Sequence, residues 1–309
     1  MAHRVPLARR NLFQDRRRAT LSVLGVACAL VLVLVLNGVY AGAMRQVTTY
    51  IDDSPAGVFV SQSGVRTMHM STTSLPDDTL TRVRSVRGIA WAEPLRYTTG
   101  LISTGSGSDI AYVFGYDPST KHAGPHRITA GRAPRAREVV VDEAAADELG
   151  IKLGDTVRVL GSPLQVSGLA SGGTNIVNTT VFITAEEFTR LRGPGLNYVL
   201  VAAKPGTADA ELARRISESV PESTVQTRRQ FSDQEALIVR DMAADIMNVM
   251  TLVGFLIALA VVALTLFTVT LSKLREYGVV KALGATGALL VRTVIVQATW
   301  TVMLATLFA

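Results

Sequence analysis

Cysteine is nearly absent from this sequence, since Cys28 is the only one in 309 residues. A single cysteine excludes an intrachain disulfide and a site built from paired cysteines. Cys28 also lies inside an uncharged run of residues. The folded part of the chain must therefore be stabilised by packing.

Motifs that carry catalytic chemistry are also absent. The stretch GATGALL from Gly284 lacks the lysine of a phosphate-binding loop, so the chain has no visible ATPase motif of its own. No HExxH or GxSxG pattern occurs either. We therefore expect a non-enzymatic chain, with no catalytic residue, no cofactor of its own and no metal site.

Two segments resemble metal sites, but simpler structural roles are preferred for both. His122 and His126 have a helical metal-ligand spacing, but Gly124 and Pro125 between them disfavour a helix, so solvated loop histidines are expected. The segment TMHMS places Met68, His69 and Met70 together, which could suit Cu(I). An exposed loop is the preferred interpretation because no other soft ligand lies nearby.

The net charge is +6, but its basic clusters are not accompanied by interleaved aromatic residues. Nucleic acid is therefore not an expected partner.

Long apolar runs are what the sequence does contain, with a mean hydropathy of +0.31. Residues 20–40 carry no charge and are long enough, at about 1.5 Å per residue, to cross a hydrocarbon core of about 30 Å. The run exceeds the apolar region of a secretory signal, so it is predicted to remain as an anchor. Residues 246–271 and 288–309 are predicted as the second and third transmembrane spans.

Basic residues set the predicted orientation, because Lys and Arg concentrate in short cytoplasmic segments. The tail, residues 1–19, is arginine-rich and amphipathic, and residues 272–287 carry Lys273, Arg275 and Lys281 against Glu276. Both segments are predicted to lie on the cytoplasmic side of the membrane, in contact with lipid. Residues 41–245 are predicted to form a large domain on the outer side.

The outer domain is predicted to have an α+β fold containing a small β-rich insert. Strand patterns such as GVFVSQ and NYVLVAAK occur near its two ends, together with a helix start at Pro76–Asp77. Within the insert we expect a helix over 143–149 that ends at Gly150. A hairpin is expected over 152–170, turning at Gly154–Asp155, with Val157 and Val159 on its buried face.

The polar residues near the predicted spans could have either a structural or a functional role. Asp241 and Asp245 lie one helical turn apart and could form an ion site, but solvated carboxylates at a helix end are preferred. Asn248 and Gln297 could hydrogen-bond between helices, and a packing role is preferred to contact with a substrate.

The outer domain resembles that of MacB-like ABC transporter permeases. The resemblance is carried by FGYDP at 114–118, by the run 131–161, by LQVSGLA at 164–170 and by VFIT at 181–184.

The stretch KLREYGVVKALGATGALLVRTVIVQA at 273–298 resembles the segment that follows the second span of FtsX-like permeases. From periodicity alone, residues 274–283 of this stretch form an amphipathic interfacial helix, which ends at Gly284. The resemblance implies instead that it docks onto a cytoplasmic ATPase. The implied contact residues are Arg275, Glu276, Tyr277, Lys281, Leu283 and Gly284.

The resemblance implies a permease subunit in a bacterial cytoplasmic membrane, working as a homo- or heterodimer with a separate ABC ATPase that binds ATP. The family has four spans, and the fourth is absent from this sequence. Two alternatives stay open: an FtsX-type regulator of an extracytoplasmic cell-wall hydrolase, and a membrane-anchored sensor or binding module. The cargo and any further extracytoplasmic partner are left open.

Overall fold

The computed structural model describes residues 16–68, 71, 73–105, 107–120, 122–173, 179–272 and 274–282, and scattered residues from 284 to 306. It divides into two compact units, one made of residues 1–41 and 242–309 and the other of residues 42–241. Residues 1–15 of the predicted amphipathic tail and the side chains of Glu276, Tyr277 and Gln297 lie outside the described residues.

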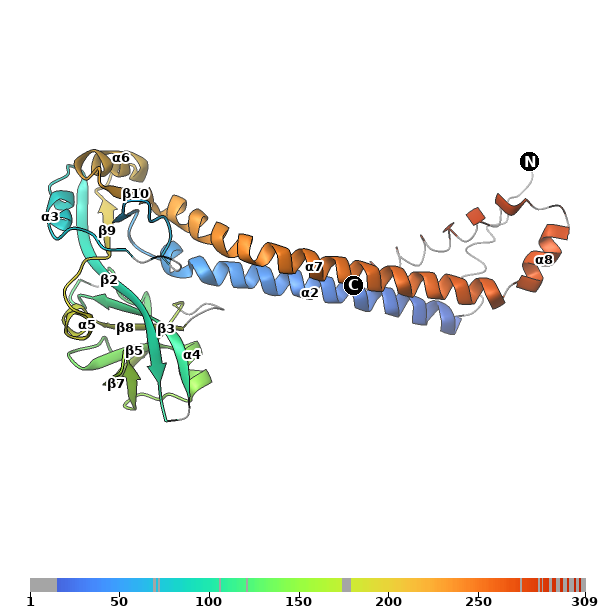
Figure 1. Cartoon of the computed structure of the whole chain (residues 1–309), viewed down its shortest axis with the longest axis horizontal. Helices are drawn as coiled ribbons and strands as arrows, with labels where there is room; N and C mark the ends of the chain where they lie inside the picture. Colours follow the sequence, from blue (N-terminus) through green and yellow to red (C-terminus); the bar gives the residue numbers. More distant parts are fainter. Residues whose placement is uncertain are drawn as a thin grey trace. The chain divides into compact units, whose positions relative to one another are not determined.

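The first unit contains parts of two long helices, α2 (Arg16–Asp52) and α7 (Arg228–Ser272), followed by α8 (Leu274–Ala282) (Figure 1). Many of their apolar side chains are exposed, for example that of Phe255, which is 62% exposed. By length and composition, Leu30–Asp52 could cross a membrane, and Asn248–Val261 is a shorter apolar helix. The three predicted spans stay a prediction.

Within this unit α2 and α7 approach closely at Gly254, which is buried. A Cβ atom added to Gly254 would lie 2.6 Å from Cγ2 of Val33, a separation that side chains do not tolerate. Small residues permit this kind of close helix contact.

The second unit contains a ten-stranded sheet with four short helices, and it confirms the predicted α+β fold. The sheet order is β10-β1-β9-β2-β3-β8-β5-β7-β4, and β6 pairs with β2 and β7. The strands are β1 (Val58–Gln62), β2 (Ile89–Ser103), β3 (Ser108–Tyr116), β4 (Arg127–Gly131), β5 (Glu138–Asp142), β6 (Thr156–Val159), β7 (Ser162–Ser171), β8 (Thr179–Thr184), β9 (Tyr198–Ala203) and β10 (Ser223–Thr227). The helices are α3 (Thr79–Arg84), α4 (Glu143–Leu149), α5 (Ala185–Arg192) and α6 (Asp209–Ser219).

The long strand β2 joins the two parts of this sheet. Its first half pairs with β9, and its second half pairs with β3 and thereby with the insert strands. The predicted insert therefore continues the main sheet. The two ends of the domain meet because β1 pairs with both β9 and β10.

The insert follows the sequence pattern except at its hairpin turn. Helix α4 covers the predicted residues and ends at Gly150, whose φ is 66°. Val157 and Val159 are buried as expected. The predicted turn at Gly154–Asp155 is wrong, because the two paired strands β6 and β7 are joined by Leu160 and Gly161.

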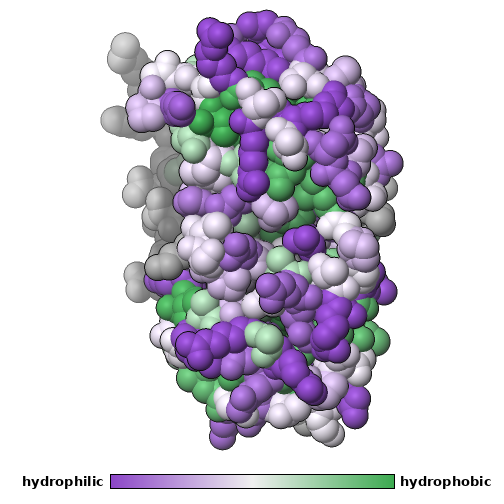
Figure 2. All heavy atoms as spheres, turned by 90° about the vertical axis from the view of Figure 1, so that its left-hand side faces the viewer, coloured by the Kyte–Doolittle hydropathy of each residue, from purple (hydrophilic) through white to green (hydrophobic). Residues whose placement is uncertain are grey.

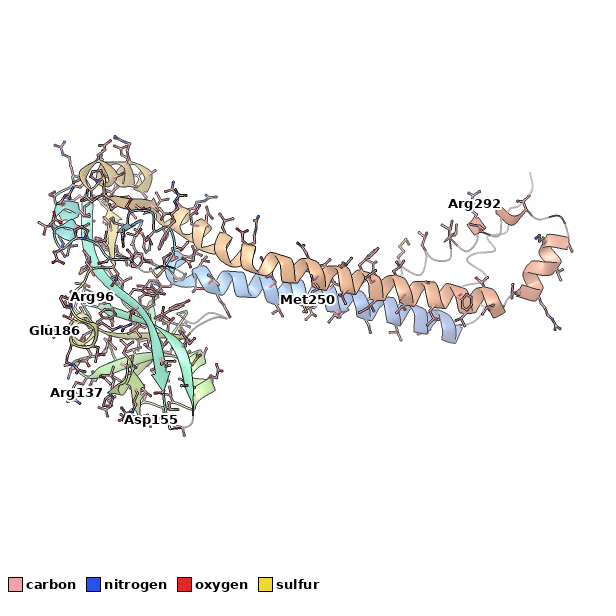
Figure 3. The ribbon with its side chains drawn as sticks, viewed as in Figure 1. Arg96, Arg137, Asp155, Glu186, Met250 and Arg292 are labelled. Carbon is pink, nitrogen blue, oxygen red and sulfur yellow. The ribbon has the colours of Figure 1, made fainter. Side chains whose placement is uncertain are left out.

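The physical reason is that Asp155, labelled in Figure 3, closes a different loop. Its carboxylate accepts a 2.8 Å hydrogen bond from the Lys152 amide, which fixes the segment before β6. Leu160 and Gly161 both have positive φ, 52° and 81°, the combination that a tight two-residue hairpin turn requires.

Candidate functional site

The second unit corresponds to the predicted outer domain, and we use that name for it from here on. The C-terminal end of α2 is embedded in its core. The Tyr50 ring stacks on Phe114 with centroids 4.5 Å apart, and its hydroxyl donates a 2.9 Å hydrogen bond to the Ala123 carbonyl. Ile51 is fully buried in the same cluster. The helix end is therefore held by both packing and a long-range hydrogen bond.

His126 adds a second polar contact to this helix end. Its Nε2 lies 2.9 Å from the Tyr50 carbonyl, which can only accept, so Nε2 donates. Burial lowers the pKa of His126, partly opposed by the Tyr50 carbonyl and by the charge of Asp53. The neutral imidazole is the form that suits this position.

The N-terminal end of α7 is embedded in the same core. Phe231 is fully buried between Phe59 and Tyr198, at centroid distances of 5.0 and 6.0 Å. One turn later, Glu235 is also buried, and its Oε2 accepts a 2.6 Å hydrogen bond from the Met68 amide. We call these two embedded helix ends, α2 at Val47–Ile51 and α7 at Phe231–Glu235, the helix roots.

A cavity of about 530 Å³ opens elsewhere on the outer domain, between α3, the start of β2 and the loop after β3. Figure 2 shows a face of the molecule on which apolar atoms lie among hydrophilic side chains. The residues that line the cavity are Leu80, Arg84, Ile89, Ala90, Trp91, Ala92, Glu93, Pro94, Asp117 and Thr120. We call it the edge groove.

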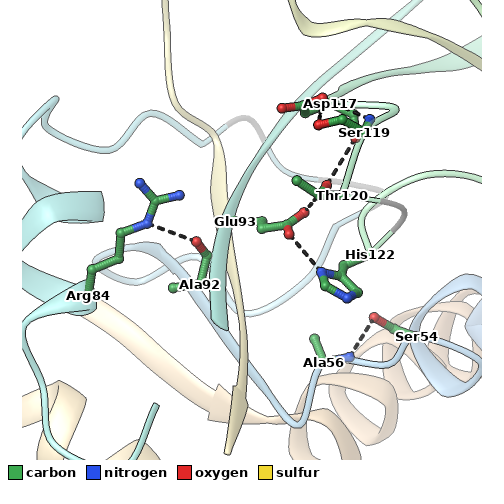
Figure 4. Close-up of polar contacts among 9 residues, drawn as sticks. All are labelled: Ser54, Ala56, Arg84, Ala92, Glu93, Asp117, Ser119, Thr120 and His122. Atoms are coloured by element: carbon green, nitrogen blue, oxygen red, sulfur yellow. Dashed lines mark hydrogen bonds and ion pairs between the residues drawn. The ribbon is translucent and has the colours of Figure 1, made fainter. Parts of the chain in front are cut away.

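A polar network lies beside this groove (Figure 4). Glu93 is buried, and its two carboxyl oxygens contact the Thr120 hydroxyl and Nδ1 of His122, the latter at 2.7 Å. The His122 imidazole also stacks on the Trp91 indole, with centroids 4.2 Å apart and planes 4° apart. The loop after β3 is thereby fixed against β2.

These contacts correct two predictions. His122 and His126 are not solvated loop residues, because each joins its loop to another element. Met68 does not lie in an exposed loop, since it is fully buried beneath the α7 root. His69 and Met70 lie outside the described residues, within which no group of three His, Cys, Asp or Glu side chains could hold a metal ion.

Asp241 is exposed, as expected, but it lies within continuous α7 and not at a helix end. The side chain of Asp245 is not described, and Asn248 is exposed. The structure therefore gives neither Asp241 nor Asn248 a polar partner among the described residues.

The predicted ATPase-contact residues fall on and just after α8. Arg275 and Lys281 are exposed on this helix, and the Gly284 amide donates to the Lys281 carbonyl at 3.0 Å. Gly284 has a φ of 93°, which fits its predicted place after the helix. Leu283 is outside the described residues, so the grouping of all six residues stays a prediction.

The helix roots and the edge groove were not found from the sequence. The roots depend on side chains from elements more than 100 residues apart, such as Met68 and Glu235. The only local signal was the apolar spacing of Tyr50, Ile51 and Phe231 next to the long runs. The groove depends on where β3 stops pairing with β2, which no local pattern records.

Comparison with known proteins identifies the outer domain. Residues 19–219, more than half of the chain, match the model of the MacB-like periplasmic core domain family. An uncharacterized ABC transporter permease from Mycobacterium tuberculosis is 24% identical over 282 residues, covering 90% of this chain and 76% of the relative. A second from the same species is 22% identical over 279 residues, with the same two coverages.

Two solved structures are also similar. The periplasmic region of MacB from Actinobacillus actinomycetemcomitans aligns with a TM-score of 0.45 and 15% identity, covering 59% of this chain and 92% of that one. The extracellular domain of the noncanonic ABC-type transporter YknZ from Gram-positive bacteria aligns with a TM-score of 0.40 and 14% identity, covering 56% and 98%. The family match and the permease relatives carry the assignment: this chain belongs to the MacB-like periplasmic core domain family and is a MacB-like ABC transporter permease, a protein of the cytoplasmic membrane with its α+β domain outside the cytoplasm.

Proposed function

We propose that this chain is a permease subunit that carries ATP-driven motion from a separate cytoplasmic ATPase to its outer domain, and thereby exports or extracts a substrate. The observation that supports it is the pair of helix roots. Tyr50 on α2 and Phe231 on α7 are buried in the core of the outer domain, and each helix continues into an apolar run.

The roots suit transmission because protein interiors are close-packed and pass on strain. Tyr50 and Phe231 lie in one hydrophobic cluster that also contains Phe114 and Leu200 from the sheet. A displacement of either helix would therefore move strands of the sheet with it. The permease relatives from Mycobacterium tuberculosis support the same class of function.

The separate ATPase subunit would dock at α8, and ATP would bind to that subunit. Arg275 and Lys281 are exposed cations on this helix, suited to carboxylates on a partner. A second permease subunit, identical or different, would complete the complex, as in the family that the sequence resembles.

The test is co-purification of the full chain with candidate cytoplasmic ABC ATPases, with Arg275→Glu and Lys281→Glu compared at matched membrane levels. Arg229→Glu is the matched control, since Arg229 is exposed on the part of α7 that belongs to the outer domain. We expect both α8 variants to reduce ATPase capture and the control to leave it unchanged. Absence of capture by the wild-type chain, or equal loss in all three variants, would contradict coupling through α8.

A further inference from the structure

One side of the first part of β2 has no strand partner. Residues 89–95 pair with β9, whereas pairing with β3 begins only at Arg96. Among the described residues, no strand pairs with the other side of residues 89–94. This stretch is an open sheet edge inside an otherwise continuous sheet.

The edge groove runs along this open edge. Its lining residues Ala90, Ala92 and Pro94 belong to the unpaired stretch, while Leu80 comes from α3 and Thr120 from the loop after β3. The cavity of about 530 Å³ falls within the range of about 300–1,000 Å³ that is typical of ligand sites. Helix α3 and the loop after β3 therefore flank the unpaired edge, and the groove lies between them.

Arg84 occupies one hydrogen-bonding group of this edge. Its Nε donates a 3.0 Å hydrogen bond to the Ala92 carbonyl, the position that a neighbouring strand's amide would take (Figure 4). Pro94 has no amide hydrogen, and proline in a strand is characteristic of edges. An arginine side chain therefore satisfies one edge carbonyl in place of a strand.

The charges around the groove favour a basic occupant. Glu93 is buried and already bonded to Thr120 and His122, so the exposed carboxylate of the described lining is that of Asp117. The one cation of that lining, Arg84, is bonded to the Ala92 carbonyl. Hydrogen bonds from the Ser119 amide and hydroxyl lower the pKa of Asp117, which keeps it ionised at neutral pH. The Trp91 indole, one face of which is covered by His122, also lines the groove and adds an aromatic surface of the kind that attracts cations.

We propose that the edge groove binds an extended peptide segment carrying a basic side chain, which pairs with residues 90–94 as an added β-strand. Backbone hydrogen bonds to β2 would supply affinity, one of them replacing the bond from Arg84 to the Ala92 carbonyl, and the exposed Asp117 carboxylate would select the basic side chain. The proposal does not depend on ATP-driven coupling, because it concerns the outer domain alone.

The test measures binding of a fluorescent, end-blocked peptide, Val-Lys-Val-Lys-Val, to the full chain in nanodiscs of neutral phosphatidylcholine. Empty nanodiscs provide the background. Two companion peptides separate the contributions: one with N-methylated amides at alternate residues, and one with Glu in place of both Lys. We expect saturable binding of the Lys peptide, and binding at least about tenfold weaker for each companion.

Variants locate the site. Ala90→Arg places a long cation in the groove and should abolish binding, whereas Ala210→Arg, at an exposed position of α6 outside the groove, should not. Asp117→Asn should weaken the Lys peptide without affecting an uncharged Val-Thr-Val-Thr-Val peptide.

Three results would overturn the proposal. Equal binding of the N-methylated peptide would exclude strand pairing, and unchanged binding in Ala90→Arg would place the peptide elsewhere. No saturable binding up to millimolar peptide would show that the groove does not take this class of ligand.

Discussion

The Met68 amide donates a hydrogen bond of 2.6 Å to Oε2 of Glu235, joining the loop after β1 to the first turns of α7. Both residues are buried. The nearby Tyr198 hydroxyl donates to the Thr67 carbonyl at 3.2 Å, so the same loop is held at two adjacent positions. A buried carboxyl group thus fixes the α7 root to the loop after β1, and Tyr198 of β9 holds the same loop.

Glu235→Ala should lower the free energy of unfolding of the outer domain by about 1–3 kcal/mol, because the Met68 amide is left buried without this acceptor. Glu235→Gln keeps an oxygen acceptor and should cost less. Thermal unfolding of the full chain measures both effects. Asp233→Ala, at an exposed position of the same helix, is the matched control. An equal loss in Asp233→Ala would show that the effect is not specific to the root.

Phe231→Ala should destabilise the outer domain by about 3–5 kcal/mol, since it removes a fully buried ring from between Phe59 and Tyr198. Leu237→Ala, at a position 39% exposed on the same helix, should cost much less. Chemical denaturation of the full chain, compared with limited proteolysis, provides the measurement. A loss below 1 kcal/mol would mean that α7 is not anchored by this ring.

Gly254→Leu should destabilise the helix pair in the first unit, because its Cβ would come within 2.6 Å of Cγ2 of Val33. Better helix propensity, worth about 1 kcal/mol over glycine, offsets part of that cost. Val33→Ala in the same chain should restore stability by making room. A double-mutant cycle on thermal stability should give a coupling energy of about 0.5–3 kcal/mol, and additive effects would contradict the contact.

The outer domain should lose stability as the pH falls below about 6.5, through His126. Burial lowers the pKa of His126 in the folded state, so below its usual pKa the unfolded chain binds a proton that the folded chain does not. The stability contributed by the neutral imidazole is present above that pH and decreases until the folded-state pKa is reached.

His126→Gln should therefore reduce the difference in unfolding free energy between pH 7 and pH 5, while its side-chain amide can still donate to the Tyr50 carbonyl. Unfolding of the variant and the wild-type chain at both pH values measures this. An unchanged pH dependence would assign the effect to other groups.

The amino-acid pattern predicted much of the domain because the relevant forces are local. The helix expected over 143–149 ends at Gly150 as expected, because glycine readily adopts the positive φ found there. Val157 and Val159 were placed correctly because strand side chains alternate. The hairpin turn was placed wrongly because Gly-Asp is a common turn sequence, and only the pairing of β6 with β7 distinguishes it from Leu160–Gly161.

Composition and periodicity along the chain are enough to predict the apolar runs, the basic segments beside them and the α+β class of the outer domain. The contact between Met68 and Glu235, the stacking of His122 on Trp91 and the open edge of β2 beside Arg84 became known from the folded chain. These relationships join residues distant in sequence or depend on where strand pairing stops. Long-range packing and strand register determine these relationships, and neither can be predicted from a single short segment of the sequence.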